Sequence, residues 1–218
     1  MSIASLEGVT DNELHLGIKK VFDNAKELID EADFLFANDR YSRAYCLYQL
    51  ASEEIGKGRL LFALIMNRKL GDKIDYKSVD KEFYFHQAKS KSALFFEMVA
   101  YLVMYSTQKD KSADERRDLF AKAVANVHDE NNAEKLNRYK NDSLYVGLQN
   151  DKFVCPSELI TQEMATNLRT DVLIRLEAGR TVLQNLLKDL ENIIVLVKQA
   201  HDLPDSSSEN FFDVFFKA

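Results

Sequence analysis

The sequence predicts an all-α fold, an up-and-down helical bundle of about five long helices. Its 218 residues include only 7 glycines and 2 prolines, with no glycine from Asp72 to Val146 and no proline before Pro156. A β-sandwich or barrel needs turn residues every dozen positions or so, and this chain lacks them. Apolar residues instead recur at three- and four-residue spacing, which is typical of amphipathic helices.

Each element follows from this spacing and from capping residues. Asp11 or Asn12 caps a first helix that extends to about Asn38. After the connection 38–40, a second helix extends from about Tyr41 to Leu70, and Gly71 ends it. The remaining expected elements are a third helix over about 79–106, a polar joint over 107–113, a fourth helix over about 114–127, a polar and broken helical stretch over 129–141, a loop over 147–154, and a last long helix from Ser157 to about His201.

The predicted domain organisation is one helical bundle over residues 1–203, followed by an extended tail over 204–218. The tail is rich in serine and acidic residues and then carries an aromatic cluster: Phe211, Phe212, Phe215 and Phe216. Such a cluster either docks onto the chain's own bundle or forms a dimer contact.

Composition restricts the setting and the partners. The longest apolar runs, 60–66 and 98–105, are too short to span a membrane. Two cysteines form neither a disulfide framework nor a zinc motif, which fits a reducing cytoplasm. The net charge of -6 argues against a general nucleic-acid coat protein, but the stretch 55–70 carries four basic residues and no acidic one. This strip is either a solvated helix face or a contact for RNA or an acidic partner.

A first candidate site lies in the second helix, in the sequence Glu53-Glu54-Ile55-Gly56-Lys57. Helical spacing places Glu54 at the margin of the apolar stripe, where a carboxylate must be paired. Lys57 follows Glu54 by three positions and Glu53 by four. The group is either a structural ion pair or a polar centre inside the bundle, in which the two glutamates orient a neighbour and Lys57 holds phosphate.

A second candidate site centres on His86, with Lys89 one turn later. A histidine among phenylalanines is often only a core residue, but histidine titrates near neutrality and can transfer protons in catalysis. Lys89 would then contact phosphate. The four histidines are scattered and lack ligand spacing, so no metal site and no cofactor is expected.

A third candidate site combines cations, an amide and a phenol just before the expected loop. Its members are Arg138, Lys140, Asn141 and Tyr145. Such donors suit phosphate or backbone contacts, although the segment also reads as a surface turn fixed by Tyr145.

Together these segments resemble AbiV-type abortive infection proteins of the HEPN superfamily. The resemblance rests on NAKELIDEADFLFANDRYSRAYCLYQLASEEIGKGRLL at 24–61, FYFHQAKSK at 83–91, KNDSLYV at 140–146 and FVCPSELITQEMA at 153–165. The order and spacing match over roughly residues 20–170. The Glu-Glu-Ile-Gly-Lys piece is the most specific.

The resemblance implies a cytoplasmic helical bundle, a homodimer, and a role in phage defence. Many HEPN proteins are metal-independent ribonucleases whose motif is an arginine followed, four to six residues later, by a histidine. Here no arginine has a histidine at that spacing. The counterpart begins at Arg138 or Lys140, and Tyr145 takes the later position, where a phenol is a poor base at neutral pH.

Three functions follow from these features. The first is a defence effector that a phage-encoded protein activates and that acts on RNA or translation by binding. The alternative is a metal-independent ribonuclease with a degenerate motif, in which His86 and Tyr145 are catalytic. For this reaction Glu54, His86, Lys89, Arg138, Lys140, Asn141 and Tyr145 would converge in one cleft. The third is a helical bundle outside defence that binds a small ligand or is purely structural.

Overall fold

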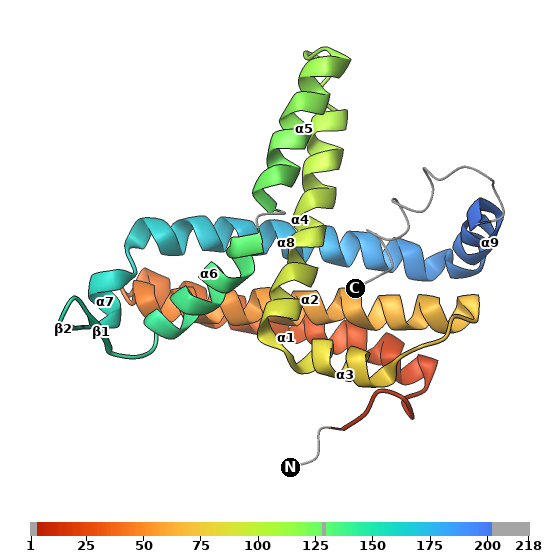
Figure 1. Ribbon diagram of the computed structural model, residues 1–218. Helices are drawn as coiled ribbons and strands as arrows, with labels where there is room; N and C mark the ends of the chain where they lie inside the picture. Colours follow the sequence, from red (N-terminus) through yellow and green to blue (C-terminus); the bar gives the residue numbers. More distant parts are fainter. Residues whose placement is uncertain (1–3, 128–129, 202–218) are drawn as a thin grey trace.

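Helix α2 is the centre of the fold, and the computed structural model describes residues 4–127 and 130–201 (Figure 1). The elements are α1 (Asp11–Ala37), α2 (Tyr41–Leu70), α3 (Tyr76–Tyr84), α4 (His86–Ser106), α5 (Ala113–Val127), α6 (Glu130–Asp142), β1 (Gly147–Gln149), β2 (Lys152–Val154), α7 (Pro156–Leu159), α8 (Gln162–Lys188) and α9 (Leu190–His201). The all-α prediction is confirmed. The aromatic tail predicted at 204–218 lies outside the described residues.

Helices α1, α2 and α8 run side by side, and the α4–α5 hairpin stands out from them (Figure 1). Phe22 of α1 fits between two glycines of the neighbouring helices. A Cβ atom on Gly58 of α2 would lie 2.6 Å from the Phe22 ring, and one on Gly179 of α8 would lie 2.8 Å from it. The two glycines therefore allow three helices to approach one ring.

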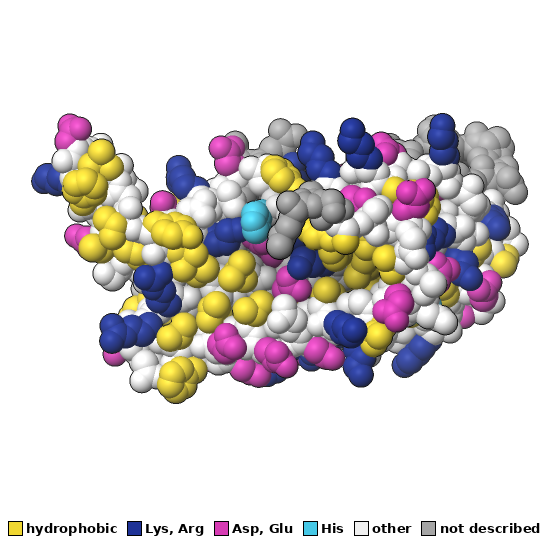
Figure 2. Space-filling model, turned by 90° about the horizontal axis from the view of Figure 1, so that it is seen from below, with side chains coloured by type: hydrophobic (Ala, Val, Ile, Leu, Met, Phe, Trp, Pro, Cys, Tyr) yellow, Lys and Arg dark blue, Asp and Glu magenta, His cyan; other side chains and the backbone are white. Residues whose placement is uncertain are grey.

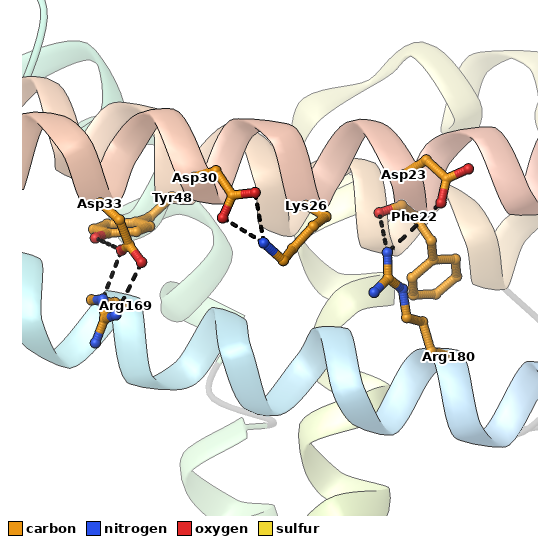
Figure 3. A network of polar contacts seen from close by, with 8 residues as sticks. All are labelled: Phe22, Asp23, Lys26, Asp30, Asp33, Tyr48, Arg169 and Arg180. Carbon is orange, nitrogen blue, oxygen red and sulfur yellow. Dashed lines mark hydrogen bonds and ion pairs between the residues drawn. The ribbon is translucent and has the colours of Figure 1, made fainter.

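Polar contacts fix α8 against α1 at two points (Figure 3). The Arg169 guanidinium donates to both oxygens of Asp33 at 2.7 and 3.0 Å, and the Tyr48 hydroxyl donates to the same carboxylate at 2.5 Å. The hydrogen bond from Arg169 is the main reason that the pKa of Asp33 is lowered. Farther along α8, Arg180 lies 3.7 Å from Asp23. These contacts set the register of the two helices.

The third helix, predicted as continuous over 79–106, is in fact two helices that meet at Phe85. Phe85 has φ -84° and ψ 124°, so the chain is extended there between α3 and α4. Helix α3 is tied to the N-terminal segment, where the Leu6 amide donates to Asp80 at 2.8 Å. Helix α4 instead crosses α2 at Gly56. One straight helix cannot make both contacts.

The last helix is likewise divided, and it begins at Pro156 rather than Ser157. The Thr161 side chain accepts a hydrogen bond from the Met164 amide and starts α8. A further break at Asp189 separates α8 from α9. The division between α7 and α8 has a local cause, because the Thr161 hydroxyl caps the backbone and so competes with continuation of the helix.

The loop predicted at 147–154 contains a short antiparallel hairpin of β1 and β2, in which Leu148 pairs with Phe153. Asn150 and Asp151 form its turn with φ of 49° and 62°. Asn and Asp tolerate this left-handed region better than most residues, so the hairpin needs no glycine there. None of the helices in the described ranges is long and apolar enough to cross a membrane.

Candidate functional site

The buried carboxylate of Glu53 on α2 contacts side chains of two other helices, α4 and α6. Glu53 lies on α2 and is 2% exposed. Lys140 of α6 donates to its Oε1 at 2.6 Å. Its Oε2 lies 2.6 Å from Nδ1 of His86 and 3.3 Å from Nζ of Lys89, both on α4. These four residues are called the Glu53 cluster below.

The break at Phe85 and the close approach of α2 and α4 build this cluster. Because α4 begins at His86, His86 and Lys89 are one turn apart and reach the same carboxylate. Gly56 is three residues after Glu53, and a Cβ atom there would lie 1.9 Å from the backbone oxygen of Lys89. Only glycine allows the two backbones to come so close, so Gly56 positions α4 on Glu53.

Lys140 is presented by the last turn of α6. The hydroxyl of Ser143 donates to the Lys140 carbonyl at 2.6 Å, and the Ser143 amide donates to the Tyr139 carbonyl at 2.9 Å. A cation is favoured at this end of a helix because the unpaired carbonyls carry partial negative charge. The sequence thus directs an ammonium group from the α6 terminus into the bundle.

The cluster carries a net positive charge. Burial acts to raise the pKa of Glu53, but the hydrogen bonds from Lys140 and His86 outweigh it and leave that pKa below its ordinary value of 4.5. Glu53 is therefore ionised at neutral pH, opposite two ammonium groups. The side chains of Lys89 and Lys140 are almost fully buried, whereas that of His86 is 55% exposed. An incoming group reaches His86 first.

Glu54 and Lys57 form a separate pair. They contact each other across one turn of α2, as expected for a structural ion pair. Lys57 also lies 5.6 Å from the centre of the Phe83 ring. The polar centre inside the bundle is thus built on Glu53 rather than on Glu54, which is only half-buried.

In the described part of the chain, no hydrogen bond or ion pair joins Arg138, Asn141 or Tyr145 to the Glu53 cluster. All three side chains are exposed. Arg138 lies over the Tyr139 ring at 5.3 Å, and the Asn141 carbonyl accepts from the Tyr145 amide at 3.0 Å. Successive helical residues point about 100° apart, so when Lys140 faces inward its neighbours face elsewhere. Tyr145 follows the end of α6 and belongs to the turn.

A second buried network adjoins the first and was not predicted from the sequence. Arg175 of α8 donates through Nε and Nη2 to Glu97 of α4 at 2.8 and 2.6 Å, and through Nη1 to Ser52 of α2 at 2.9 Å. The Tyr101 hydroxyl donates to the other oxygen of Glu97 at 3.0 Å. A signal was present, because Arg175 interrupts an apolar stripe that includes Val172, Leu176 and Gly179.

The Glu53 cluster can hold an anion and can move a proton. Contact of Nδ1 with the carboxylate fixes the His86 ring and leaves Nε2 free of that bond. Carboxylate-bound histidines of this kind act as general bases or acids in many enzymes. Within the described ranges, no three or more His, Cys, Asp or Glu side chains are grouped so that they could hold a metal ion.

The chain was compared with known protein families, curated proteins and solved structures. The family model described as AbiV, in the HEPN group, matches residues 13–175, well over half of the chain. The matched range includes all four members of the Glu53 cluster. No curated protein and no solved structure matches the chain.

Proposed function

Because the chain belongs to the AbiV family of HEPN proteins, we propose that it is an abortive-infection effector that binds RNA through the Glu53 cluster. It acts in the cytoplasm, and a phage-encoded protein activates it. The observation that carries the proposal is that one buried carboxylate, Glu53, contacts the half-exposed His86 and two buried lysines.

An RNA phosphate fits the charge of this cluster. Two ammonium groups exceed one carboxylate, so the cluster attracts an anion even when His86 is neutral. Phosphate contacts supply most of the affinity of nucleic-acid binding without depending on sequence. The net charge of the whole chain is -6, so the surface as a whole does not attract RNA. We therefore expect one bound RNA segment rather than coating of RNA.

A second candidate function is metal-independent cleavage of RNA, favoured by the 2.6 Å contact between Glu53 Oε2 and His86 Nδ1. With Nδ1 protonated and facing the carboxylate, Nε2 can accept a proton from a 2′-hydroxyl, which then attacks the adjacent phosphate. Lys89 and Lys140 would stabilise the charge that develops on that phosphate. Tyr145, from the turn after α6, would donate to the leaving group if it came within reach.

We include a homodimer in this proposal, since HEPN active motifs commonly meet across two subunits. A second copy would bring exposed residues such as Arg138 and Asn141 toward a shared RNA. Light scattering at micromolar concentration tests this part, and a mass of one chain of 25.0 kDa would contradict it.

The test of function compares His86→Ala with Lys91→Ala. Both residues are exposed on α4, but only His86 contacts Glu53. Labelled tRNA and total cellular RNA are titrated in EDTA, with and without an extract of phage-infected cells. We expect His86→Ala to weaken binding at least tenfold and Lys91→Ala to change it little. Equal effects of the two variants would refute binding at the cluster.

The same reactions, separated on a denaturing gel, test cleavage. Products that form in EDTA with the wild type, and that disappear with both His86→Ala and Tyr145→Phe, would support the ribonuclease. If the RNA stays intact in every reaction that shows binding, the ribonuclease is refuted and the effector that acts by binding is supported.

A further inference from the structure

A pocket of about 620 Å³ lies between α3 and the N-terminal segment, and its lining includes Phe85, the residue before His86. Its walls include Tyr76, Lys77, Asp80, Lys81, Tyr84 and Phe85. A volume of this size is typical of sites for small organic ligands. Resting on the proposed function, the geometry points to this pocket as the subsite for an unstacked nucleobase next to the phosphate at His86.

The aromatic side chains give the pocket its preference for a planar group. Tyr84 and Phe85 are 43% and 50% exposed, and both line the pocket. Single-stranded RNA is commonly recognised by stacking its splayed bases on such rings. The pocket therefore offers a stacking surface that the cluster itself lacks.

The charge of the pocket separates it from a phosphate site. Its lining holds two basic residues, Lys77 and Lys81, and two acidic ones, Glu7 and Asp80, so their formal charges sum to zero. A phosphate gains little from such a lining. A neutral base carries both amino donors and ring or carbonyl acceptors, and carboxylates and ammonium groups can bond to each. The net positive charge lies at the neighbouring cluster, where the phosphate belongs.

The pocket and the cluster are joined by consecutive residues. Phe85 lines the pocket, and His86 contacts Glu53. Their Cα atoms are about 3.8 Å apart, and the proposal requires one nucleotide to bridge the pocket and the cluster at this point of the chain. Figure 2 views the molecule from the side on which α3 lies, and it shows that both apolar and charged side chains are exposed on this face.

The wall opposite α3 is held firmly enough to shape a ligand site. Arg68 donates to the backbone carbonyls of Leu6 and Val9 at 2.8 and 2.5 Å. The Tyr84 hydroxyl donates to the Ala4 carbonyl at 3.2 Å, and Asp80 accepts from the Leu6 amide. The N-terminal segment is thus fixed to α2 and α3 from both ends of the pocket.

The test uses Phe85→Ala and a matched control, Phe153→Ala. Both phenylalanines are exposed, at 50% and 79%, but Phe153 lies in β2, outside the pocket. The probes are a short 2′-O-methyl RNA, which cannot be cleaved through its 2′-hydroxyl, and an oligomer of the same length without bases. Nucleosides without phosphate form a third probe, followed by saturation-transfer NMR.

We expect Phe85→Ala to weaken binding of the base-bearing RNA by about 5- to 150-fold, the range for loss of one stacked base. It should leave binding of the baseless oligomer unchanged, whereas His86→Ala weakens both. Nucleosides should give saturation transfer with the wild type and Phe153→Ala, but much less with Phe85→Ala.

Two results separate failure of the pocket from failure of the proposed function. If RNA binding depends on His86 but Phe85→Ala behaves like Phe153→Ala with every probe, the base subsite is refuted and the function stands. If no RNA binds, the proposed function fails, and saturation transfer to the nucleosides then tests whether the pocket binds a base. Binding that depends on Phe85 then assigns the pocket to a free nucleoside or nucleotide, and its absence refutes the pocket.

Discussion

Replacing Glu53 with glutamine removes the one negative charge that the Glu53 cluster contains. The amide is nearly isosteric with the carboxylate, so no cavity forms. Lys89 and Lys140 remain almost fully buried. The Glu53 carboxylate, whose Oε1 lies 2.6 Å from Lys140 Nζ, is replaced by a neutral amide that no longer balances their charge. The variant therefore isolates an electrostatic effect.

The expected loss is large because these charges are buried. Two unit charges 2.6 Å apart attract by about 6 kcal/mol at an effective dielectric constant of about 20, of which desolvation cancels a part. Removing one partner of a buried pair typically costs about 3–5 kcal/mol. For a chain of this size, each kcal/mol lowers Tm by about 2–4 °C. We expect Glu53→Gln to lower Tm by about 6–20 °C.

The matched control is Glu54→Gln, one residue along the same helix. Glu54 pairs with Lys57 where solvent reaches both side chains, and such pairs contribute about 0–1 kcal/mol. Urea denaturation followed by circular dichroism gives the free energy of unfolding of each variant. A Glu53→Gln loss below about 1 kcal/mol, or one equal to that of Glu54→Gln, would refute the reasoning.

The pH dependence of the same difference checks the lowered pKa of Glu53. Because the pKa in the folded state lies below the ordinary value of 4.5, ionised Glu53 stabilises the fold fully above that value. The contribution is lost as the pH falls through the folded-state pKa. The gap between wild type and Glu53→Gln should shrink as the pH falls below about 4.5. A gap that stayed constant or widened as the pH fell from about 4.5 to 2 would contradict this sign.

Two further variants test how the helices are held together. Gly56→Ala would gain about 1 kcal/mol in helix propensity, but its Cβ would lie 1.9 Å from a backbone oxygen of α4. We therefore expect urea denaturation to show a net loss of about 1–3 kcal/mol in the free energy of unfolding. A net gain would show that the two helices do not pack tightly at Gly56. Gly147→Ala, whose Cβ meets no atom within 4 Å, is its control and should change little. Arg175→Met should lower the free energy of unfolding by about 3–5 kcal/mol because it leaves Glu97 buried without its partner. In a double-mutant cycle, adding Glu97→Gln should restore part of that loss. Additive effects of the two changes would argue against a stabilising ion pair between Arg175 and Glu97.

Helix periodicity predicted most of the fold, although the N-cap of α1 is Thr10 rather than Asp11 or Asn12. The ends of α1 and α2 agree with the prediction to within a residue or two, because Gly71 and the connection 38–40 are strong local signals. The breaks at Phe85 and Asp189 carry no glycine or proline. They arise because the helical segments on either side pack against different partners, which periodicity alone does not reveal.

The sequence by itself determined the helical class, the approximate helices, the AbiV resemblance and the residue types available for chemistry. Only the tertiary structure decided that Glu53 rather than its neighbour Glu54 is the centre of the site. The two glutamates differ by one position, or about 100° around α2, and the apolar stripe alone favours Glu54. The choice depends on α4 crossing at Gly56 and on Lys140 arriving from 87 residues away. Such long-range contacts depend on how whole helices pack, and local sequence does not encode them.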